Sequence, residues 1–195
     1  PKFNLVSDKL YYYTNTEMAK LVSSTNITTS DGTFVYGENG VYNTKQAKAY
    51  LLDRSYIIKD MRKIIGDSLH YDKTTGISEG FGNVIITDDE NKCTLKGDYC
   101  RYEDLTGNAM ATGRAVVMEY SSPDTIYVHG DTLRMYSYNH NTDSVYRNIH
   151  AYNHVRMFRN DVQAVCDSLV AVSPDSCTYL YGQPILWNEQ QQIFG

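Results

Sequence analysis

The sequence contains few of the residues that mark several common classes of protein. Among 195 residues there are only 4 Pro, 4 Cys, 5 Phe and 1 Trp. No apolar run approaches the roughly 18 residues that a membrane-spanning helix needs, so no transmembrane segment is expected. Basic residues are also few, because 18 Lys and Arg stand against 23 Asp and Glu, giving a net charge of −5. That balance argues against a nucleic-acid partner, since phosphate contacts need clustered Lys and Arg.

The cysteines and histidines lack the spacing of a metal or catalytic site. No C-x-x-C pair is present, which makes zinc improbable. A disulfide between Cys166 and Cys177 is possible in an oxidising compartment, and packed free thiols, including Cys93 and Cys100, are the alternative. The sequence has no Gly-rich phosphate loop, nucleophile elbow or Cys–His signature. We therefore expect no enzyme activity, no cofactor and no metal.

Tyrosine is the abundant residue, with 18 copies, and 42% of the chain is apolar. Tyr and Thr favour β-strands, and the apolar fraction is sufficient for a folded core. Apolar residues alternate at a spacing of two, as in the pairs at 69 and 71, 84 and 86, and 126 and 128. This is the period of a strand, so an all-β fold is predicted.

A repeated unit runs through the whole chain. One half of the unit is Asp-x-aliphatic, and its copies follow one another in steps of 31, 28, 31, 33 and 36 residues. These copies begin at Asp8, Asn39, Asp67, Asp98, Asp131 and Asp167. The other half has an apolar pair two residues apart, often after Gly-Asn or Asn-His. A polar insertion at 138–146, predicted to be a surface loop, explains the one long gap.

Each unit is predicted to be a bent hairpin of about 31 residues. Turn signals separate its two halves, and a glycine lies in the middle of most long segments. Glycine inside a strand commonly marks a bend or bulge. The apolar phase shifts at Gly130, as expected where a strand passes from one sheet to another. About six stacked hairpins would form two facing sheets with an apolar interior.

The units form one predicted domain that spans residues 1–195. Three of them begin with Gly-Asp, at 66, 97 and 130, and the sequence stops at Gly195. We therefore expect this chain to be part of a longer protein whose next residue is Asp. An open terminal repeat would leave an unpaired sheet edge.

The repeated motif resembles that of the OstA-like (LptA-like) family of lipopolysaccharide-transport proteins. Residues 66–72 have the pattern Gly-Asp-Ser-Leu-x-Tyr-Asp, and residues 82–88 have Gly-Asn-Val-x-Ile-x-Asp. The resemblance covers residues 8–195 and is strongest from 66 to 135. Departures include Asn39 and Cys100 at repeat positions, Pro184 and the insertion after Tyr138. The high Tyr and low Lys content suggests a Bacteroidetes-type member.

The resemblance implies an open β-jellyroll, a folded two-sheet trough that shields the acyl chains of lipopolysaccharide. It also implies a place in the periplasm or at the periplasmic face of the outer membrane. The family includes the periplasmic bridge protein and the N-terminal domain of the outer-membrane translocon. Its members associate edge to edge through terminal strands, either with copies of themselves or with other transport domains of this kind.

The physics of lipid transfer supports an apolar trough. An acyl chain of about 12 to 14 carbons gains roughly 10 kcal/mol on full burial, at about 0.8 kcal/mol per CH₂. The candidate lining residues are apolar or aromatic and alternate along their predicted strands. They are Leu69, Tyr71, Val84, Ile86, Val117, Val128, Leu133, Met135, Val155, Met157, Ile185 and Trp187. The alternative for each of them is ordinary core packing.

Two other functions remain open at this point. A polysaccharide-binding β-repeat domain would use Tyr side chains to stack on sugars. A structural domain of a cell-envelope assembly would bind no ligand at all. Binding of an acylated glycolipid, but not of its deacylated sugar, would separate the lipid trough from the first of these.

Overall fold

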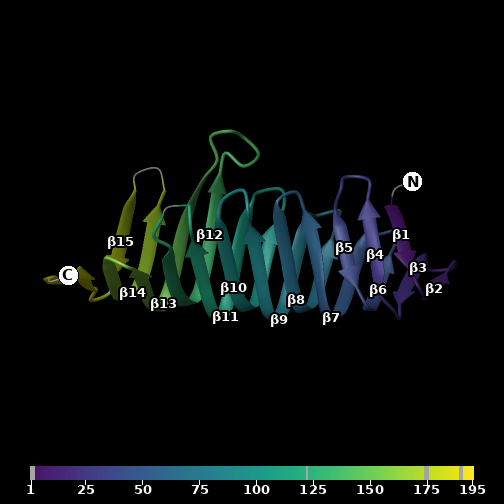
Figure 1. Ribbon diagram of the computed structural model, residues 1–195, viewed down its shortest axis with the longest axis horizontal. Helices are drawn as coiled ribbons and strands as arrows, with labels where there is room; N and C mark the ends of the chain where they lie inside the picture. Colours follow the sequence, from purple (N-terminus) through teal and green to yellow (C-terminus); the bar gives the residue numbers. More distant parts are fainter. Residues whose placement is uncertain (1–2, 122, 174–175, 189–190) are drawn as a thin grey trace.

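The computed structural model describes residues 3–121, 123–173, 176–188 and 191–195, and in these ranges the regular structure is all β-strand. Figure 1 shows an elongated molecule in which the strands run across the long axis and the two ends of the chain lie at opposite ends. The strands are β1 (Phe3–Ser7), β2 (Leu10–Tyr13), β3 (Met18–Leu21), β4 (Thr25–Thr29), β5 (Phe34–Gly37), β6 (Asn39–Asn43), β7 (Lys48–Lys59), β8 (Arg62–Asp72), β9 (Ile77–Asp88), β10 (Cys93–Glu103), β11 (Asn108–Glu119), β12 (Ile126–Tyr138), β13 (Tyr146–Arg159), β14 (Val162–Val172), β15 (Cys177–Tyr181), β16 (Ile185–Asn188) and β17 (Gln191–Phe194).

The strands form a single antiparallel sheet that is folded lengthwise into two layers. From β7 to β14 each strand has 11 to 14 residues and crosses the fold line, which we call the crease. Layer 1 contains β2, β3, β6, β15 and the segments 48–52, 68–72, 77–81, 99–103, 108–112, 132–138, 146–152 and 168–172. Layer 2 contains β1, β4, β5, β16, β17 and the remaining segments of the long strands.

The crease follows from backbone geometry that the sequence encodes at regular intervals. Pairs of consecutive residues with positive φ lie at 53–54, 82–83, 113–114, 153–154 and 182–183. The strand register shifts beside the first four of these pairs, as at a β-bulge, and β15 gives way to β16 at the fifth. Glycine, Asn or Asp occupies the first position of each pair, because these residues reach the left-handed region at least cost.

The repeated Asp of the sequence motif faces these bends. The Asp67 carboxylate accepts a hydrogen bond from Asn83 Nδ2 at 2.8 Å, and Asp98 accepts one from Arg114 Nε at 3.0 Å. A Cβ at Gly82 would come within 2.5 Å of Asp67 Oδ2, so glycine also makes room for the carboxylate. The partner side chain thus comes from the bend of the next strand arm. The repeated Asp therefore joins two neighbouring strands at the crease through its side chain.

The core lies between the two layers and extends along most of the long axis. Leu21, Leu51, Leu69, Leu133 and Leu169 are each almost fully buried within one continuous apolar cluster. They alternate with exposed or half-buried residues along each strand, as the period of two predicts. The layers therefore enclose an apolar interior, and the predicted all-β open jellyroll is confirmed.

The predicted surface loop at 138–146 and the predicted shift at Gly130 are both confirmed. The strand β12 ends at Tyr138 and β13 begins at Tyr146, so the polar insertion is the hairpin loop that rises above the others in Figure 1. At Gly130 the pairing of β12 with β13 shifts between His129 and Thr132.

Candidate functional site

The interior of the folded sheet is the candidate site, and ten of the twelve predicted lining residues face it. Nine of these are buried, whereas Met157 is half-buried and packs against the same cluster. Strand pairing places residues from both layers around one space, since Leu69 and Leu133 belong to layer 1 and Val84 and Val117 to layer 2. In this structure the side chains of the chain itself fill that space.

The last two predicted residues, Ile185 and Trp187, are not placed with the others. They pair with Val165 and Gln163 of β14, which alternate with the buried Ala164. Ile185 and Trp187 therefore lie on the outer surface of layer 2, and Leu186 takes the interior position between them. A shift of one residue in register moves every side chain to the other face, which is why the apolar pattern alone placed them wrongly.

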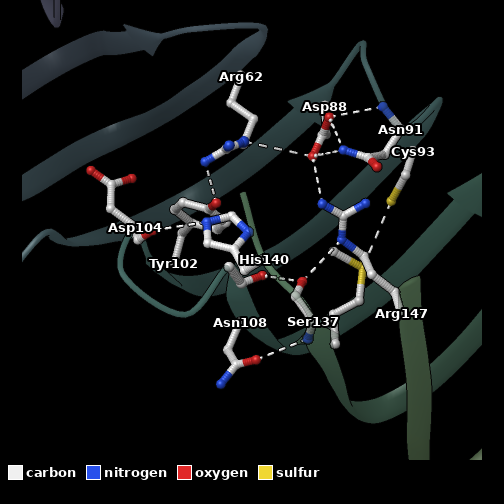
Figure 2. Close-up of polar contacts among 12 residues, drawn as sticks. Arg62, Asp88, Asn91, Cys93, Tyr102, Asp104, Asn108, Ser137, His140 and Arg147 are labelled. Atoms are coloured by element: carbon white, nitrogen blue, oxygen red, sulfur yellow. Dashed lines mark hydrogen bonds and ion pairs between the residues drawn. The ribbon is translucent and has the colours of Figure 1, made fainter. Parts of the chain in front are cut away.

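On the side of the molecule opposite the crease, the free margins of the two layers are joined by polar contacts. We call this side the mouth. Figure 2 shows its central cluster, in which Asp88 of layer 2 lies 3.2 Å from Arg147 Nη2 of layer 1 and 3.7 Å from Arg62 Nε. Asn91 donates to the same carboxylate at 2.8 Å, and Arg62 also donates to the Tyr102 hydroxyl across the mouth. These contacts join strands that are distant in sequence.

Two further ion pairs cross the mouth. Lys59 Nζ of layer 2 lies 2.7 Å from Asp104 Oδ2 at a turn of layer 1. Lys73 Nζ of layer 1 lies 3.1 Å from Asp31 Oδ1 at the β4–β5 turn of layer 2. With the Asp88 cluster, these pairs form three bridges along the mouth. We call them the mouth bridges.

The mouth bridges lie in surroundings that shift several pKa values. Burial lowers the pKa of the Lys59 ammonium, but its hydrogen bond to Asp104 and the charge of that carboxylate together outweigh this effect and raise the pKa above its usual value. Burial raises the pKa of Asp31, but the hydrogen bonds from Thr29 and Lys73 prevail and hold this pKa well below its usual range. Burial raises the pKa of Tyr102 to about 12. Lys59, Asp31 and Tyr102 therefore keep their ordinary charge states at neutral pH.

The bridges stop before the C-terminal end of the molecule. In the part of the chain that the structure describes, the Asp88–Arg147 pair is the last ion pair between the layers. Beyond it, Ile149, Met157, Leu180 and Leu186 are only half-buried. The two layers thus cover the interior less completely at this end than in the middle.

The cysteines of the chain are free thiols in this structure. Cys93, Cys100 and Cys166 are buried free thiols, and burial raises the pKa of both Cys93 and Cys100 to about 12. Cys177 pairs with Val172, which lies six residues along β14 from Cys166 and on the other side of the crease, and both thiols are free. That separation rules out the disulfide considered from the sequence. Among the described residues, no group of three or more His, Cys, Asp or Glu is arranged to hold a metal ion.

Sequence reasoning missed the mouth bridges. Within the acidic segment at 88–90, Asp89 and Glu90 are exposed, whereas Asp88 is buried. The bridged residues are 42 to 59 positions apart in sequence, so no local spacing reveals them. Two other cations do not reach the mouth: Arg54 lies against Asp67 at the crease, and Lys63 lies over the ring of Tyr56.

An antiparallel sheet folded into an open trough, with free edges at both ends, defines the class of open β-jellyroll proteins. Among solved structures of this class, the chain is similar to LptH, the LptA-homologous periplasmic component of the lipopolysaccharide transport device from Pseudomonas aeruginosa. The two share 15% sequence identity with a TM-score of 0.50, and the match covers 61% of this chain and 80% of LptH. The LptA-like fold predicted from the repeated motif is thereby confirmed.

The other comparisons add no further relatives. No protein-family model matches the sequence, and the search of curated proteins gave no match. No helix in the described ranges is long and apolar enough to cross a membrane.

Proposed function

We propose that this chain is a non-enzymatic lipid-shielding module of a lipopolysaccharide transport bridge in the periplasm. The observation that supports this most directly is the apolar interior, which extends along the long axis and is covered on two sides by sheet. The similarity to LptH, whose description places it in lipopolysaccharide transport, supports the same function. Acyl chains would lie between the layers, while sugars and phosphates remain in water.

The distribution of bridges indicates where acyl chains would enter. The interior is packed by its own side chains, so a lipid must separate the layers to be covered by them. The C-terminal end beyond Arg147 has half-buried apolar residues and no ion pair between layers among its described residues. Opening this end breaks no ion pair between the layers among the described residues, so we propose that acyl chains first insert there.

Photo-crosslinking tests the proposal with two neighbouring positions on β13. Met157 faces the interior and is half-buried, whereas Phe158 faces outwards and is 44% exposed. A benzophenone amino acid at position 157 should crosslink to intact lipopolysaccharide but not to its deacylated sugar. The same group at position 158 is the matched control and should give little crosslink to either. Because neither position is fully buried, both variants are expected to keep the fold, which circular dichroism would check.

The outcome that contradicts lipid shielding is specific. If the fold is intact and position 157 gives no crosslink to acylated lipopolysaccharide, the interior is not a lipid site. Crosslinking from position 158 alone would instead place the glycolipid on the outer surface. A ligand-free structural domain would give no crosslink from either position.

The free edges of the sheet are the surfaces for bridge assembly in this proposal. β1 and β2 at one end, and β15 and β17 at the other, each pair with other strands on one side only. The exposed Ile193 and Phe194 on β17 add apolar surface at the C-terminal edge. Unpaired edges readily pair with another strand, and charge on an edge strand opposes this. An Ile193→Lys variant should therefore self-associate less than the parent chain in sedimentation equilibrium.

A further inference from the structure

A cluster of aromatic and cationic side chains lies on the outer surface of layer 1, away from the interior. Thr132, Arg134 and Tyr136 follow one another at every second position of β12, and His150 and Tyr152 do so on the paired strand β13. These five residues share one face of the sheet because side chains alternate along a strand. Their neighbours in sequence, such as Leu133 and Ala151, are buried in the core.

The rings of this cluster hold one another in place. The Tyr136 ring packs edge-to-face on His150 with centroids 4.9 Å apart. The Tyr152 hydroxyl lies 3.3 Å from His150 Nδ1, and the two rings are 6.3 Å apart. His150 is thus fixed between two tyrosines, and Tyr152 remains 36% exposed. The outer surface therefore presents ordered ring faces and hydroxyl groups to solvent.

Arg134 is the cation of this cluster that its surroundings do not neutralise. Within the described part of the chain it has no ion pair, and its cross-strand neighbours are Met110 and His150. Burial lowers the pKa of His150, so this ring is neutral at physiological pH. By contrast, the nearby Arg101 is paired with Glu103 at 2.9 Å. A solvent-exposed guanidinium therefore lies among ordered tyrosines without a carboxylate partner.

Two surface hollows meet at Arg134 and Tyr136. One is also lined by Thr132 and Tyr152. The other extends over β10 and β11 and is also lined by Asn108, Met110 and the Arg101–Glu103 ion pair, in which the one carboxylate of its lining is neutralised. Together they form a shallow groove that crosses four adjacent strands, with the guanidinium at its middle.

This combination of groups matches the chemistry of an acidic sugar. Tyr combines an apolar ring face with a polar hydroxyl, as a sugar combines an apolar C–H face with hydroxyl groups. A guanidinium matches the geometry of a carboxylate or phosphate through two parallel hydrogen bonds. We propose that the groove around Arg134 binds a saccharide that carries a carboxylate or phosphate, with the sugar ring on Tyr152 and the oxyanion on Arg134.

This site is separate from the lipid-shielding interior and does not depend on it. Its residues lie on the outer face of layer 1, whereas the ten lining residues face the interior between the two layers. Loss of acyl-chain binding would therefore leave the saccharide site intact, and the two proposals can fail independently.

The test is a titration of the isotope-labelled chain followed by NMR. Three probes separate the chemistries: trigalacturonic acid for a carboxylate, glucose 6-phosphate for a phosphate, and maltotriose as the neutral control. We expect saturable shifts of the amide signals at 132–136 and 150–152 with at least one acidic probe. The probe that saturates identifies the oxyanion. Maltotriose should bind at least about tenfold more weakly, because it lacks the charge-assisted hydrogen bonds.

Three variants complete the test. Arg134→Gln should lower the affinity for the acidic probe at least about tenfold and leave the affinity for maltotriose unchanged. Tyr152→Ala should lower the affinity for every probe that binds. Arg156→Gln is the matched control, since Arg156 is an exposed arginine of the same strand on the outer surface of layer 2, and it should change nothing. Absence of saturable shifts with both acidic probes, or equal losses in Arg134→Gln and Arg156→Gln, would overturn the proposal.

Discussion

At the scale of single residues, Asp88 illustrates how a charge in an apparently solvent-exposed motif becomes structural. It belongs to an acidic hairpin tip, yet its side chain is only 7% exposed and contacts two arginines that are 11% and 13% exposed. Asn91 occupies part of its remaining hydrogen-bonding capacity. Removing one partner of such a group leaves the others buried without compensation.

Asp88→Asn is therefore expected to lower the free energy of unfolding by about 3 kcal/mol, because Arg62 and Arg147 lose their common counter-charge. Urea unfolding monitored by circular dichroism measures this loss. The matched control is Asp89→Asn at the next, exposed position, which should change stability by less than about 0.5 kcal/mol. Equal effects of the two substitutions would show that Asp88 does not bridge the layers in solution.

A pH dependence is expected from Asp31, whose pKa is held well below its usual range by Thr29 and Lys73 against the effect of burial. Because the folded-state pKa lies below the unfolded value near 3.9, the stabilisation by ionised Asp31 is fully present above about pH 4. It is lost as the pH falls through the folded-state value. Asp31→Asn should thus cost about 1 kcal/mol equally at pH 7 and pH 5, since this pair is partly exposed.

The measurement for Asp31 is urea unfolding at pH 7, 5 and 3. The difference between the parent chain and Asp31→Asn should begin to shrink only at the lowest of these values. Glu90→Gln on an exposed hairpin tip is the control and should show no comparable difference. A cost that has already disappeared at pH 5 would contradict a depressed pKa.

At the scale of the strands, the bends are the feature that the repeated motif encodes. Gly82 and Gly113 have φ of 71° and 68°, and each faces the carboxylate of a repeated Asp. At the corresponding bend of β13, Asn153 has φ of 61°. The repeat thus shows that Asn is compatible with the first position of the bend. Other side chains there would strain the backbone and crowd the carboxylate of the repeated Asp.

Gly82→Ala should destabilise the protein by about 2 kcal/mol, because Ala strains the backbone and its Cβ displaces the Asp67 carboxylate. Gly82→Asn should cost clearly less, as the native Asn153 indicates. Gly32→Ala is the matched control: φ there is 84° and no atom lies within 4 Å of the added Cβ, so only the backbone term remains. Thermal or urea unfolding of the three variants gives the comparison. If Gly82→Ala lowers the free energy of unfolding no more than Gly32→Ala does, the added Cβ does not clash with the Asp67 carboxylate.

The elements were largely predictable because their signals are local. The period of two, the Gly residues of the bends and the turn residues all act within a few positions, so the bent hairpins, the loop at 138–146 and most interior residues follow from sequence. The contacts between layers were not predictable, since Asp88 and Arg147 are 59 positions apart. Near β16 the pattern also failed, because Ile185, Leu186 and Trp187 are all apolar and do not define which face is buried.

At the scale of the whole molecule, the two ends of the trough differ. The ring of Phe3 in layer 2 contacts that of Tyr42 in layer 1 at 5.7 Å, and the mouth bridges continue as far as Arg147. Beyond that, β15 and β17 consist largely of exposed or half-buried residues. Segments with few buried contacts open at lower free energy than the core of a domain.

Hydrogen exchange should therefore be uneven along the chain. Amides of β15 and β17 should exchange roughly 100-fold faster or more than those of β9 to β11, because local opening there breaks few contacts. Mass spectrometry of exchanged peptides measures this ratio. Intact lipopolysaccharide should slow exchange at the C-terminal end, and its deacylated sugar should not. Uniform exchange across all strands would contradict an end that opens first.

The regular crease has a consequence for how such a molecule changes in length. Each unit contacts mainly its neighbours, so stability in such an arrangement is close to a sum of unit and neighbour terms. Adding or deleting one unit of two strand arms would alter the span by two strand spacings, roughly 10 Å, without disturbing the rest. Tandem duplication of a single unit can therefore lengthen the molecule along its long axis in fixed increments.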